Sequence, residues 1–419
     1  MYGRRVVITG MGAVSSVGNS VDAMWDSLVY GRCGIDRITR FSPDNLKTQI
    51  AGEVKNLDFS RVGSEKELRK QDLFCVYAAV AFQEAALNAG LPLNFADEGS
   101  PINPEMAGVC IGSGIGGIQT LETQSKTLLE KGPGRVSPFL IPMMITDMAS
   151  GSVSIQCGAK GPNFSVVSAC ASGCHAIGEA FHAIARGDAD LMVTGGTEST
   201  LTPLCFAGFC AMKALSRRND DPKTASRPFD RDRDGFVMSE GAGILILEEY
   251  EHAKKRGATI YAEILGYSAT GDAYHITSPA PEGQGGARAF RNALRNAELN
   301  FDQVDYVNAH GTSTHLNDLY ETQALKSVFG DHARKMAVSS TKGTMGHSLG
   351  AAGGLETIVC CKAIQTGIIP PTINYMNPDP ECDLDYTPNE ARERKVDVAV
   401  NTNLGFGGHN GVIVLRRCP

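Results

Sequence analysis

Long apolar runs are absent from this 419-residue sequence, although 42% of its residues are hydrophobic. Nowhere do about 18 apolar residues follow one another, so we expect no transmembrane helix. The apolar run that follows Arg4 and Arg5 is too short for a signal peptide and is typical of a buried first strand. The sequence therefore predicts a soluble, cytoplasmic protein with no membrane partner.

Positive charge is also in short supply, and the cysteines follow no regular pattern. The 39 basic residues are outnumbered by 46 acidic ones, and the resulting net charge of -7 speaks against general attraction to nucleic acid or to an anionic membrane. No Cys-x-x-Cys pair occurs among the 12 cysteines, so their spacing supports neither a zinc site nor a disulfide framework. Scattered cysteines in a chain of this length are typical of a reducing compartment. We expect no metal site and no nucleic-acid partner.

The sequence does contain short β-branched runs that alternate with alanine-rich stretches, which is typical of an α/β protein. Its 47 glycines have no fixed period and indicate tight turns and close backbone contacts. The predicted strands are residues 5–9, 107–111, 164–167, 191–194, 243–247, 261–267, 304–308, 336–339, 396–401 and 412–416. The predicted helices are residues 71–89, 171–185, 284–297, 319–328 and 349–365.

A charged stretch, residues 248–256, separates the first five predicted strands from the last five and is expected to form a surface helix. The two series have a similar element order, with Cys170 after a strand in the first and His310 after a strand in the second. This order is a weak sign of an internal repeat. We therefore expect two similar α/β halves, residues 1–255 and residues 256–419.

Cys170 lies where a predicted buried strand opens directly into a helix. The small residues that follow it, Ala171, Ser172 and Gly173, leave room for a substrate against the backbone. Unpaired amides and the positive dipole end at a helix start would lower the thiol pKa and favour the nucleophilic thiolate. A buried structural cysteine is the alternative, and it is the interpretation retained for Cys174. The local sequence leaves both interpretations open for Cys170.

Two histidines stand on glycine-rich turns after predicted strands. His310 lies in the run Asn-Ala-His-Gly-Thr-Ser-Thr. His347 lies in a second glycine-rich run, residues 339–356, between Lys342 and Glu356. A lone histidine is more often a hydrogen-bonded structural residue than a catalyst. We keep that interpretation for the histidines at positions 175, 182, 252, 275, 315, 332 and 409. From the residues alone, Lys342 and Glu356 are equally compatible with an ordinary surface lysine and an ordinary carboxylate on a helix face.

Four motifs occur in order along the chain: SACASG around Cys170, NAHGTST around His310, STKGTMGH followed by GAAGG around His347, and NLGFGGHN near the end. Together with RVVITGMGAVSSVG, GSGIGG, RPFDRDRDGFVMSEGAG and DAYHITSP, they resemble the condensing enzymes of fatty-acid synthesis over nearly the whole chain. The match is closest to the elongating 3-oxoacyl-[acyl-carrier-protein] synthase II type. The resemblance implies a thiolase-like fold, with two duplicated α/β halves in a five-layered α-β-α-β-α arrangement, and a homodimer.

The resemblance also implies roles for particular residues. Cys170 matches the acyl-accepting nucleophile, and His310 and His347 complete a Cys-His-His triad. Lys342 and Glu356 match a supporting charged pair. Phe406 matches the residue that gates the acyl pocket and whose amide joins that of Cys170 in an oxyanion hole. The positions that match substrate-binding residues are Ile115, Phe209, Thr312 and Thr314.

The implied reaction is a decarboxylative Claisen condensation. The Cys170 thiolate takes the acyl group from a thioester, and two amides stabilise the tetrahedral oxyanion. Neutral His310 and His347 then hydrogen-bond a malonyl thioester while it loses its carboxylate, and the carbanion attacks the acyl group. The implied partner is an acyl carrier protein that carries acyl and malonyl groups, and the reaction requires no cofactor.

An acidic carrier protein needs a local basic patch on a chain whose net charge is negative. Two groups of basic residues are candidates for docking it, and an ordinary solvated surface is the alternative for both. One group is Lys66, Arg69 and Lys70, and the other is Lys213, Arg217 and Arg218, with Arg135 as a possible addition.

Three positions depart from the usual family pattern, and three other functions compete. Asn401-Thr-Asn403-Leu404 precedes Gly-Phe-Gly-Gly where the family usually has Asn-Ser-Phe, His315 replaces a proline, and Gly343 changes the run before His347. A thiolase generally uses a late second cysteine, and Cys418 has no such glycine-rich setting. The glycine pairs at positions 10 and 12 and at 112 and 114 are only weak signs of a nucleotide-binding oxidoreductase. A noncatalytic partner subunit would not require the cysteine and both histidines.

Overall fold

The computed structural model describes residues 3–418, and its main sheet has ten strands. The first five are β1 (Val6–Ser15), β4 (Ala107–Gly112), β5 (Asn163–Phe164), β6 (Leu191–Glu198) and β7 (Gly241–Glu249). The last five are β8 (Ala262–Gly271), β9 (Tyr306–Asn308), β10 (Ala337–Ser339), β13 (Val398–Gly405) and β14 (His409–Arg416). Each of the ten predicted strands overlaps one of these.

The two series of strands have the same topology. The order across the sheet is β10-β9-β13-β14-β8-β1-β7-β6-β4-β5. Read outward from the middle, each series places its first strand innermost, followed by its fifth, fourth, second and third. The series meet where residues 6–8 of β1 pair with residues 262–264 of β8. A domain boundary between residues 255 and 256 stays a prediction.

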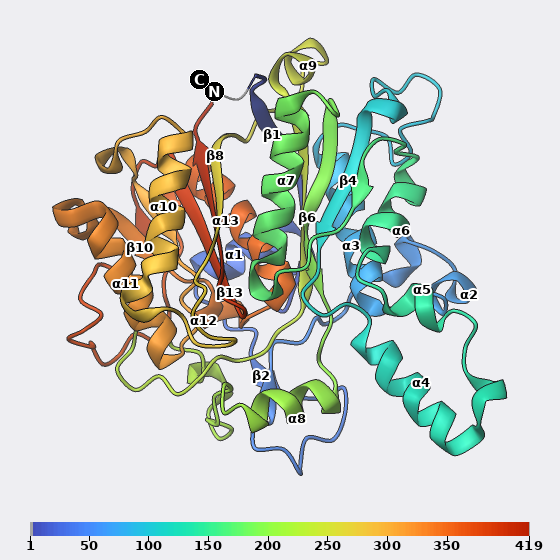
Figure 1. Cartoon of the computed structure of the whole chain (residues 1–419), viewed down its shortest axis with the longest axis horizontal. Helices are drawn as coiled ribbons and strands as arrows, with labels where there is room; N and C mark the ends of the chain where they lie inside the picture. The colour runs from blue at the N-terminus through green and yellow to red at the C-terminus, as the bar shows by residue number, and fades with distance from the viewer. Residues whose placement is uncertain (1–2, 419) are drawn as a thin grey trace.

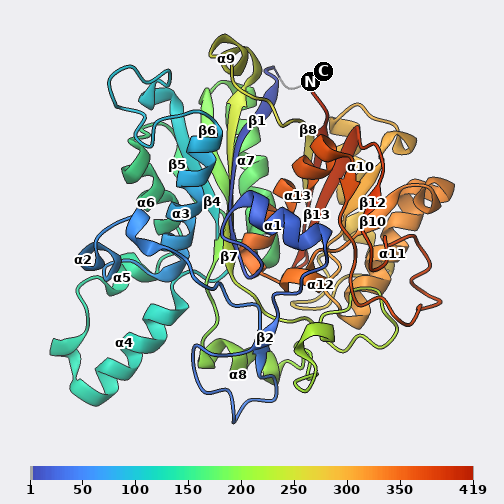
Figure 2. The same cartoon turned by 180° about the vertical axis from the view of Figure 1, so that it is seen from behind.

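Helices lie between the two halves of the sheet and on both outer faces (Figures 1 and 2). The central helices α7 (Ser172–Arg186) and α13 (Ala352–Thr366) pack against each other and against strands of both halves. Helices α3 (Leu73–Asn88) and α6 (Met148–Cys157) cover the first half. Helices α10 (Gln284–Asn296) and α11 (His315–Phe329) lie on the outer side of the second half. The predicted five-layered α/β arrangement is confirmed.

The remaining elements are short or lie outside these layers. The other helices are α1 (Val21–Val29), α2 (Glu65–Leu68), α4 (Ile118–Lys131), α5 (Leu140–Met144), α8 (Pro203–Ala211), α9 (Tyr250–Lys255) and α12 (Lys342–Met345). Two small antiparallel pairs are β2 (Asp36–Arg37) with β3 (Ile50–Ala51), and β11 (Ile368–Ile369) with β12 (Arg392–Glu393). Within residues 3–418, no helix combines the length and the apolar character that crossing a bilayer requires.

Glycine allows the central helices to approach the sheet closely. A Cβ atom on Gly354 of α13 would lie 2.1 Å from the carbonyl oxygen of Gly243 in β7, and one on Gly353 would lie 2.2 Å from the backbone nitrogen of Cys174. Neither position has room for a side chain, so the GAAGG motif serves packing. The glycines considered for nucleotide binding have a similar use, since Cβ atoms on Gly10 and Gly12 would collide with the backbone of α3.

Two expectations about local structure need correction. The strand predicted at 164–167 is limited to Asn163–Phe164, and a 3-10 turn at Ala169–Ala171 separates it from α7. The charged stretch 248–256 is only partly a surface helix, because Glu248 is a fully buried residue of β7. Its carboxylate accepts hydrogen bonds from Thr9 and Arg256 and contacts His252 at 2.9 Å. Pairing with these groups offsets the cost of burying the Glu248 charge. The charged stretch in the sequence does not show that one of its residues is buried in this way.

Candidate active site

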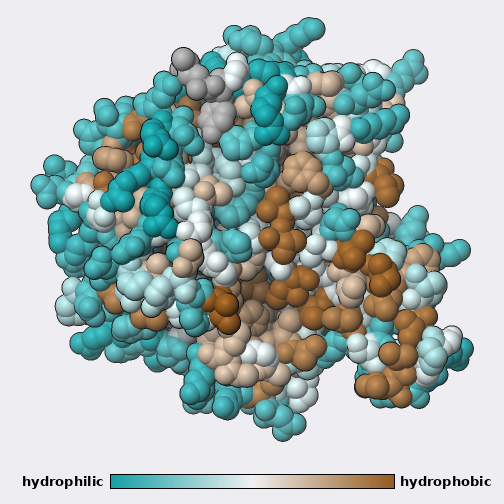
Figure 3. Space-filling view, in the orientation of Figure 1, coloured by the Kyte–Doolittle hydropathy of each residue, from teal (hydrophilic) through white to brown (hydrophobic). Residues whose placement is uncertain are grey.

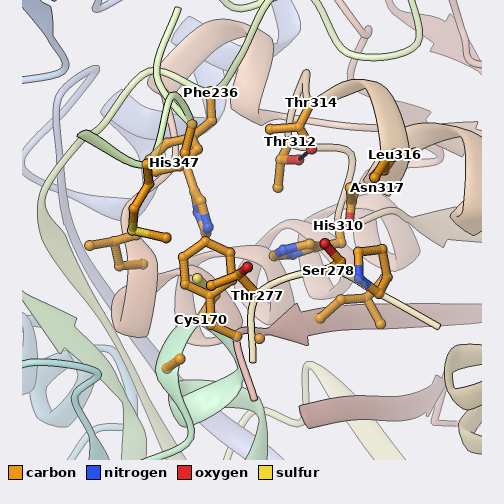
Figure 4. A pocket seen from close by; sticks show the side chains of 18 of the residues that line it. Cys170, Phe236, Thr277, Ser278, His310, Thr312, Thr314, Leu316, Asn317 and His347 are labelled. Carbon is orange, nitrogen blue, oxygen red and sulfur yellow. Dashed lines mark hydrogen bonds between the residues drawn. The ribbon is translucent and has the colours of Figure 1, made fainter. Parts of the chain in front are cut away.

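Cys170, His310 and His347 line one cavity of about 510 Å3. Cys170 comes from the turn before α7, His310 follows β9, and His347 follows α12. Figure 4 shows both imidazole rings pointing into the space beside Cys170. The sequence positions these residues at the ends of strands or turns, and the fold brings all three ends to one place.

The turn that carries Cys170 is tightly constrained. Ala169 has a φ of 51°, which is unusual for a residue with a side chain. The Ser172 hydroxyl donates to the carbonyl of Ala169 at 2.7 Å and accepts from the amide of Ser168 at 2.9 Å. These bonds stabilise a sharp bend that holds Cys170 just before α7, a geometry similar to that of nucleophiles carried on strand-to-helix turns.

The prediction that the Cys170 thiol has a lowered pKa is wrong for the free site. Burial raises the pKa of this thiol to about 12, and the charge of Lys342 and the backbone amides of Cys170 and Phe406 only partly oppose it. The sulfur lies deeper than the sequence suggests, so the loss of water outweighs the favourable amides. The two amides nevertheless approach the sulfur, as the predicted oxyanion hole requires.

His310 and His347 are held mainly through their backbones. The amides of His310 and Gly311 donate to the two carboxylate oxygens of Glu321 at 2.7 and 2.8 Å. The amide of His347 donates to Val237 at 2.7 Å. The ring centroids of the two histidines lie 5.2 Å apart with an interplanar angle of 86°.

Both imidazoles are neutral in this environment. Burial, followed by the positive charge of Lys342, holds the pKa of His310 and of His347 well below its ordinary value. The Nδ1 atoms of both rings are buried and have no hydrogen-bond partner among residues 3–418. A neutral imidazole has one N–H group to donate, so the pair can hydrogen-bond an oxygen atom without adding net charge.

Lys342 and Glu356 form a buried ion pair, and the charge of Lys342 acts on both histidines. Their side chains are about equally inaccessible, with 1% exposed on each, and Lys342 Nζ contacts one carboxylate oxygen of Glu356. Asn403 Nδ2 donates to the other oxygen at 2.7 Å. Burial raises the pKa of Glu356, whereas Lys342 and Asn403 oppose that shift.

The residues predicted to bind the acyl chain also line this cavity. Ile115 and Phe209 are lining residues, and the Phe209 ring lies 6.5 Å from that of Phe406 and 5.5 Å from that of Phe236. A Cβ atom on Gly405 would lie 3.3 Å from the Cys170 nitrogen, so the segment before Phe406 passes directly over the turn that carries Cys170. The structure thus brings the apolar residues and the reactive groups together.

Thr312, Thr314 and His315 lie at another part of the cavity wall. The hydroxyl oxygens of Thr312 and Thr314 are 2.9 Å apart. Arg233 donates to the carbonyls of Thr314 and His315 and pairs with Asp379 at 2.6 Å, which fixes the segment after His310. The substrate-binding role of the two threonines stays a prediction.

The two groups of candidate docking residues are not close together. Lys213 lines the cavity, just after α8. Lys66, Arg69 and Lys70 belong to α2 and the residues after it, and both views separate α2 from α8 (Figures 1 and 2). Arg69 pairs with Glu65 at 3.2 Å, and Lys70 lies over the ring of Phe139. One carrier protein bound to this chain alone would have to span that separation to touch both groups.

Glu198 and Glu321 are two further buried carboxylates of the site that were not predicted from the sequence. Glu198 is fully buried in the cavity wall and accepts the Ser113 hydroxyl at 2.9 Å, the Gly114 amide at 2.8 Å and the Gly350 amide at 3.0 Å. It thereby connects the turn at Ile115 to the turn after His347. The available signal was a carboxylate at the end of a buried strand, after Gly-Gly-Thr, and another on the helix that follows His310.

Comparison with known proteins identifies the family. Residues 3–253 match the Beta-ketoacyl synthase, N-terminal domain, and residues 261–376 match the Beta-ketoacyl synthase, C-terminal domain. The 3-oxoacyl-[acyl-carrier-protein] synthase 2 of Synechocystis sp. is 51% identical over 99% of this chain and 98% of its own length. The protein with the same name from Coxiella burnetii is 52% identical over 100% of this chain and 99% of its own length.

Solved structures agree over the full chain. A beta-ketoacyl synthase from Burkholderia phymatum superimposes with a TM-score of 0.91 at 38% identity, covering 99% of this chain and 100% of the other. A ketosynthase solved in complex with its type II polyketide acyl-carrier protein gives 0.90 at 35% identity, with 100% of both chains covered. These matches confirm the predicted thiolase-like fold. The chain belongs to the beta-ketoacyl synthase family.

Proposed function

We propose that this chain catalyses the decarboxylative Claisen condensation of an acyl thioester with malonyl-[acyl-carrier protein], in fatty-acid chain elongation. The product is a 3-oxoacyl-[acyl-carrier protein] extended by two carbons. The observation that carries the proposal is the single cavity where the Cys170 sulfur, two backbone amides and two neutral imidazoles converge. Family membership and the names of the relatives support the same reaction.

In the first half-reaction, the Cys170 sulfur attacks the carbonyl carbon of the acyl thioester. A new C–S bond forms, the C–S bond to the carrier breaks, and the thiol proton of Cys170 ends on the released carrier thiol. The amides of Cys170 and Phe406 donate to the tetrahedral oxyanion. Removing one such donor from an oxyanion hole typically costs about 3 kcal/mol of transition-state stabilisation.

In the second half-reaction, the malonyl thioester loses its carboxylate beside the acyl-enzyme. His310 and His347 donate hydrogen bonds to its thioester oxygen, where negative charge develops as the C–C bond breaks. The electron pair of that bond forms an enolate, whose carbon attacks the acyl carbonyl. The carboxylate leaves as carbon dioxide, the bond to Cys170 breaks after the attack, and the sulfur takes a proton from water. Neutral donors are required because an oxygen must be stabilised without a competing proton transfer.

The proposed partner is an acyl carrier protein. A solved relative of the same fold is a ketosynthase in complex with its acyl-carrier protein. On this chain, Lys213 borders the cavity that would receive the arm of the carrier, and Lys66, Arg69 and Lys70 are exposed. Exposed basic residues are suited to steering an acidic protein toward the cavity.

We further propose that the chain functions as a cytoplasmic homodimer. Strand β5 is at the edge of the sheet, and apolar side chains near it are exposed, including Ile155 at 81%, Val167 at 55% and Phe164 at 39%. Figure 3 shows apolar residues gathered on one side of the molecule. An unpaired edge strand beside exposed apolar groups is a suitable surface for a second copy. Sedimentation velocity measures the oligomeric state and so tests the dimer. The cytoplasmic location is supported by the 12 free cysteines, which are typical of a reducing compartment.

Separating the two half-reactions tests the assigned roles. Cys170→Gln should abolish acyl-enzyme formation while malonyl decarboxylation continues, because only the first step needs the nucleophile. His310→Ala and His347→Ala should retain some acylation, which uses backbone amides, and should reduce decarboxylation by about 100-fold or more. Mass spectrometry follows the acyl-enzyme, and release of labelled carbon dioxide follows decarboxylation.

Variants outside the cavity supply the controls. His332, which contacts the Val304 carbonyl at 2.7 Å, and Cys418, beside Arg5, lie away from the site, so His332→Ala and Cys418→Ser should retain both steps. Acylation of the Cys170→Gln protein at one specific residue would contradict the nucleophile assignment. Normal decarboxylation by both folded histidine variants would contradict the second assignment.

A further inference from the structure

Asn403 is the buried polar side chain that links the end of β13 to the ion pair of Lys342 and Glu356. It is fully buried, and its Nδ2 donates to Glu356 at 2.7 Å. The opposite carboxylate oxygen of Glu356 contacts Lys342. Each oxygen of this carboxylate therefore has one side-chain donor, Lys342 on one oxygen and Asn403 on the other.

A carboxylate in a dry interior depends on such donors. Burial is the largest influence on Glu356 and raises its pKa, while Lys342 and Asn403 favour the charged form. A buried carboxylate oxygen that loses its only side-chain donor becomes costly to keep ionised. A neutral Glu356 would no longer balance the buried charge of Lys342, so the ion pair depends on both donors to the carboxylate.

The state of this pair reaches all three reactive groups. The positive charge of Lys342 lowers the pKa of His310, of His347 and of the Cys170 thiol. A weaker positive charge at this position would make the histidines easier to protonate and the thiol harder to ionise. Both changes would oppose the proposed reaction.

We propose that Asn403 is a positioning residue of this active site, which holds Glu356 in its ionised form against Lys342 and so maintains the positive charge beside the histidines and Cys170. Its effect on decarboxylation rests on the proposed function. Its effect on the reactivity of the Cys170 sulfur can be measured without any substrate, so the two proposals can fail separately.

The test replaces the donor while preserving bulk. Asn403→Leu removes the amide, and Asn403→Ala removes it with less risk to folding. The matched control is Asn401→Leu on the same strand, since the Asn401 amide donates to Gly353 and Thr357 and not to the ion pair. Asn403→Ser keeps a hydroxyl donor and should restore part of the effect.

The first measurement is the rate of Cys170 alkylation by iodoacetamide at fixed pH, read by peptide mass spectrometry. Loss of the donor should raise the thiol pKa by about 0.5 to 1 unit and slow alkylation about threefold to tenfold, because the thiolate fraction falls with each unit. In the decarboxylation assay, the acid limb of the pH profile should move to higher pH by a similar amount. The Asn401→Leu variant should shift neither.

A Glu356→Gln background separates action through the ion pair from a general packing effect. If Asn403 acts through Glu356, then adding Asn403→Leu or Asn403→Ala to Glu356→Gln should cause no further change in alkylation. The proposal would be overturned if folded Asn403 variants were alkylated at Cys170 as fast as the wild type. It would also be overturned if their effect on the alkylation rate added fully to that of Glu356→Gln. Failure of the wild type to decarboxylate malonyl thioesters would instead contradict the proposed function, and the alkylation result would stand.

Discussion

At the scale of single residues, the site is built from titratable groups that have been removed from water. Burial raises the pKa of the Cys170 thiol and lowers that of both histidines, and Lys342 lowers all three. The free site therefore holds a protonated thiol and two neutral imidazoles at neutral pH. Such a site keeps both imidazoles neutral, so that each can donate a hydrogen bond. The Cys170 sulfur becomes strongly nucleophilic only when the thiol loses its proton.

The reactivity of Cys170 should consequently rise steadily with pH. Because the thiol pKa is raised to about 12, the thiolate fraction increases about tenfold for each pH unit below that value. The logarithm of the iodoacetamide rate at Cys170 should therefore climb with a slope near one from pH 7 to 10, whereas an exposed model thiol levels off above about 9. A plateau near pH 7 would mean that Lys342 and the amides outweigh burial.

The residues that sequence could and could not identify differ in a physical way. Cys170, His310 and His347 lie in short runs of small residues after strands, so their setting is local and visible in the chain. Glu198 bonds the amide of Gly350, 152 residues away, and no local pattern encodes such a contact. The direction of the Cys170 pKa shift was missed for the same reason, since burial depends on what the whole fold places around the sulfur.

At the scale of elements, the site depends on how closely α7 and α13 approach the sheet. These helices carry or adjoin the Cys170 and His347 turns, and both pack between the halves of the sheet. The helices were predictable from alanine-rich composition. Their close contacts were not, because a glycine that opens a turn and one that meets a neighbouring backbone look alike in sequence.

Adding one methyl group at this contact should destabilise the whole fold. A Cβ atom on Gly354 would lie 2.1 Å from a backbone oxygen, so Gly354→Ala should lower the free energy of unfolding by about 3 kcal/mol or more. The matched control is Gly151→Ala in α6, where the nearest atom would lie 3.6 Å away and alanine favours the helix by up to about 1 kcal/mol. Denaturant midpoints measure both, and equal midpoints would show that α13 can shift without cost.

At the scale of the whole molecule, charge and apolar surface are unevenly distributed. The chain has a net charge of -7, yet Lys213 borders the cavity and Lys66, Arg69 and Lys70 are exposed elsewhere. The separation of α2 from α8 leaves two ways for an acidic carrier to bind. The proposed carrier can use one group alone, or both groups across the surface of the proposed dimer.

Charge reversal distinguishes a docking surface from an ordinary solvated one. If these residues steer the carrier, Lys213→Glu and the double variant Lys66→Glu, Arg69→Glu should each raise the KM for acyl-[acyl-carrier protein] about threefold to tenfold at low salt, since exposed charge pairs are individually weak. The salt dependence of KM should also weaken, because added salt screens only attractions that are still present.

The control is Lys255→Glu on α9, an exposed lysine at the opposite end of the molecule from α8 (Figure 1). An acyl thioester without a carrier should show no change in the Lys66→Glu, Arg69→Glu variant, because neither residue lines the cavity. An unchanged KM for the carrier at low salt would exclude the group tested, and an effect of Lys213→Glu alone would restrict docking to the mouth of the cavity.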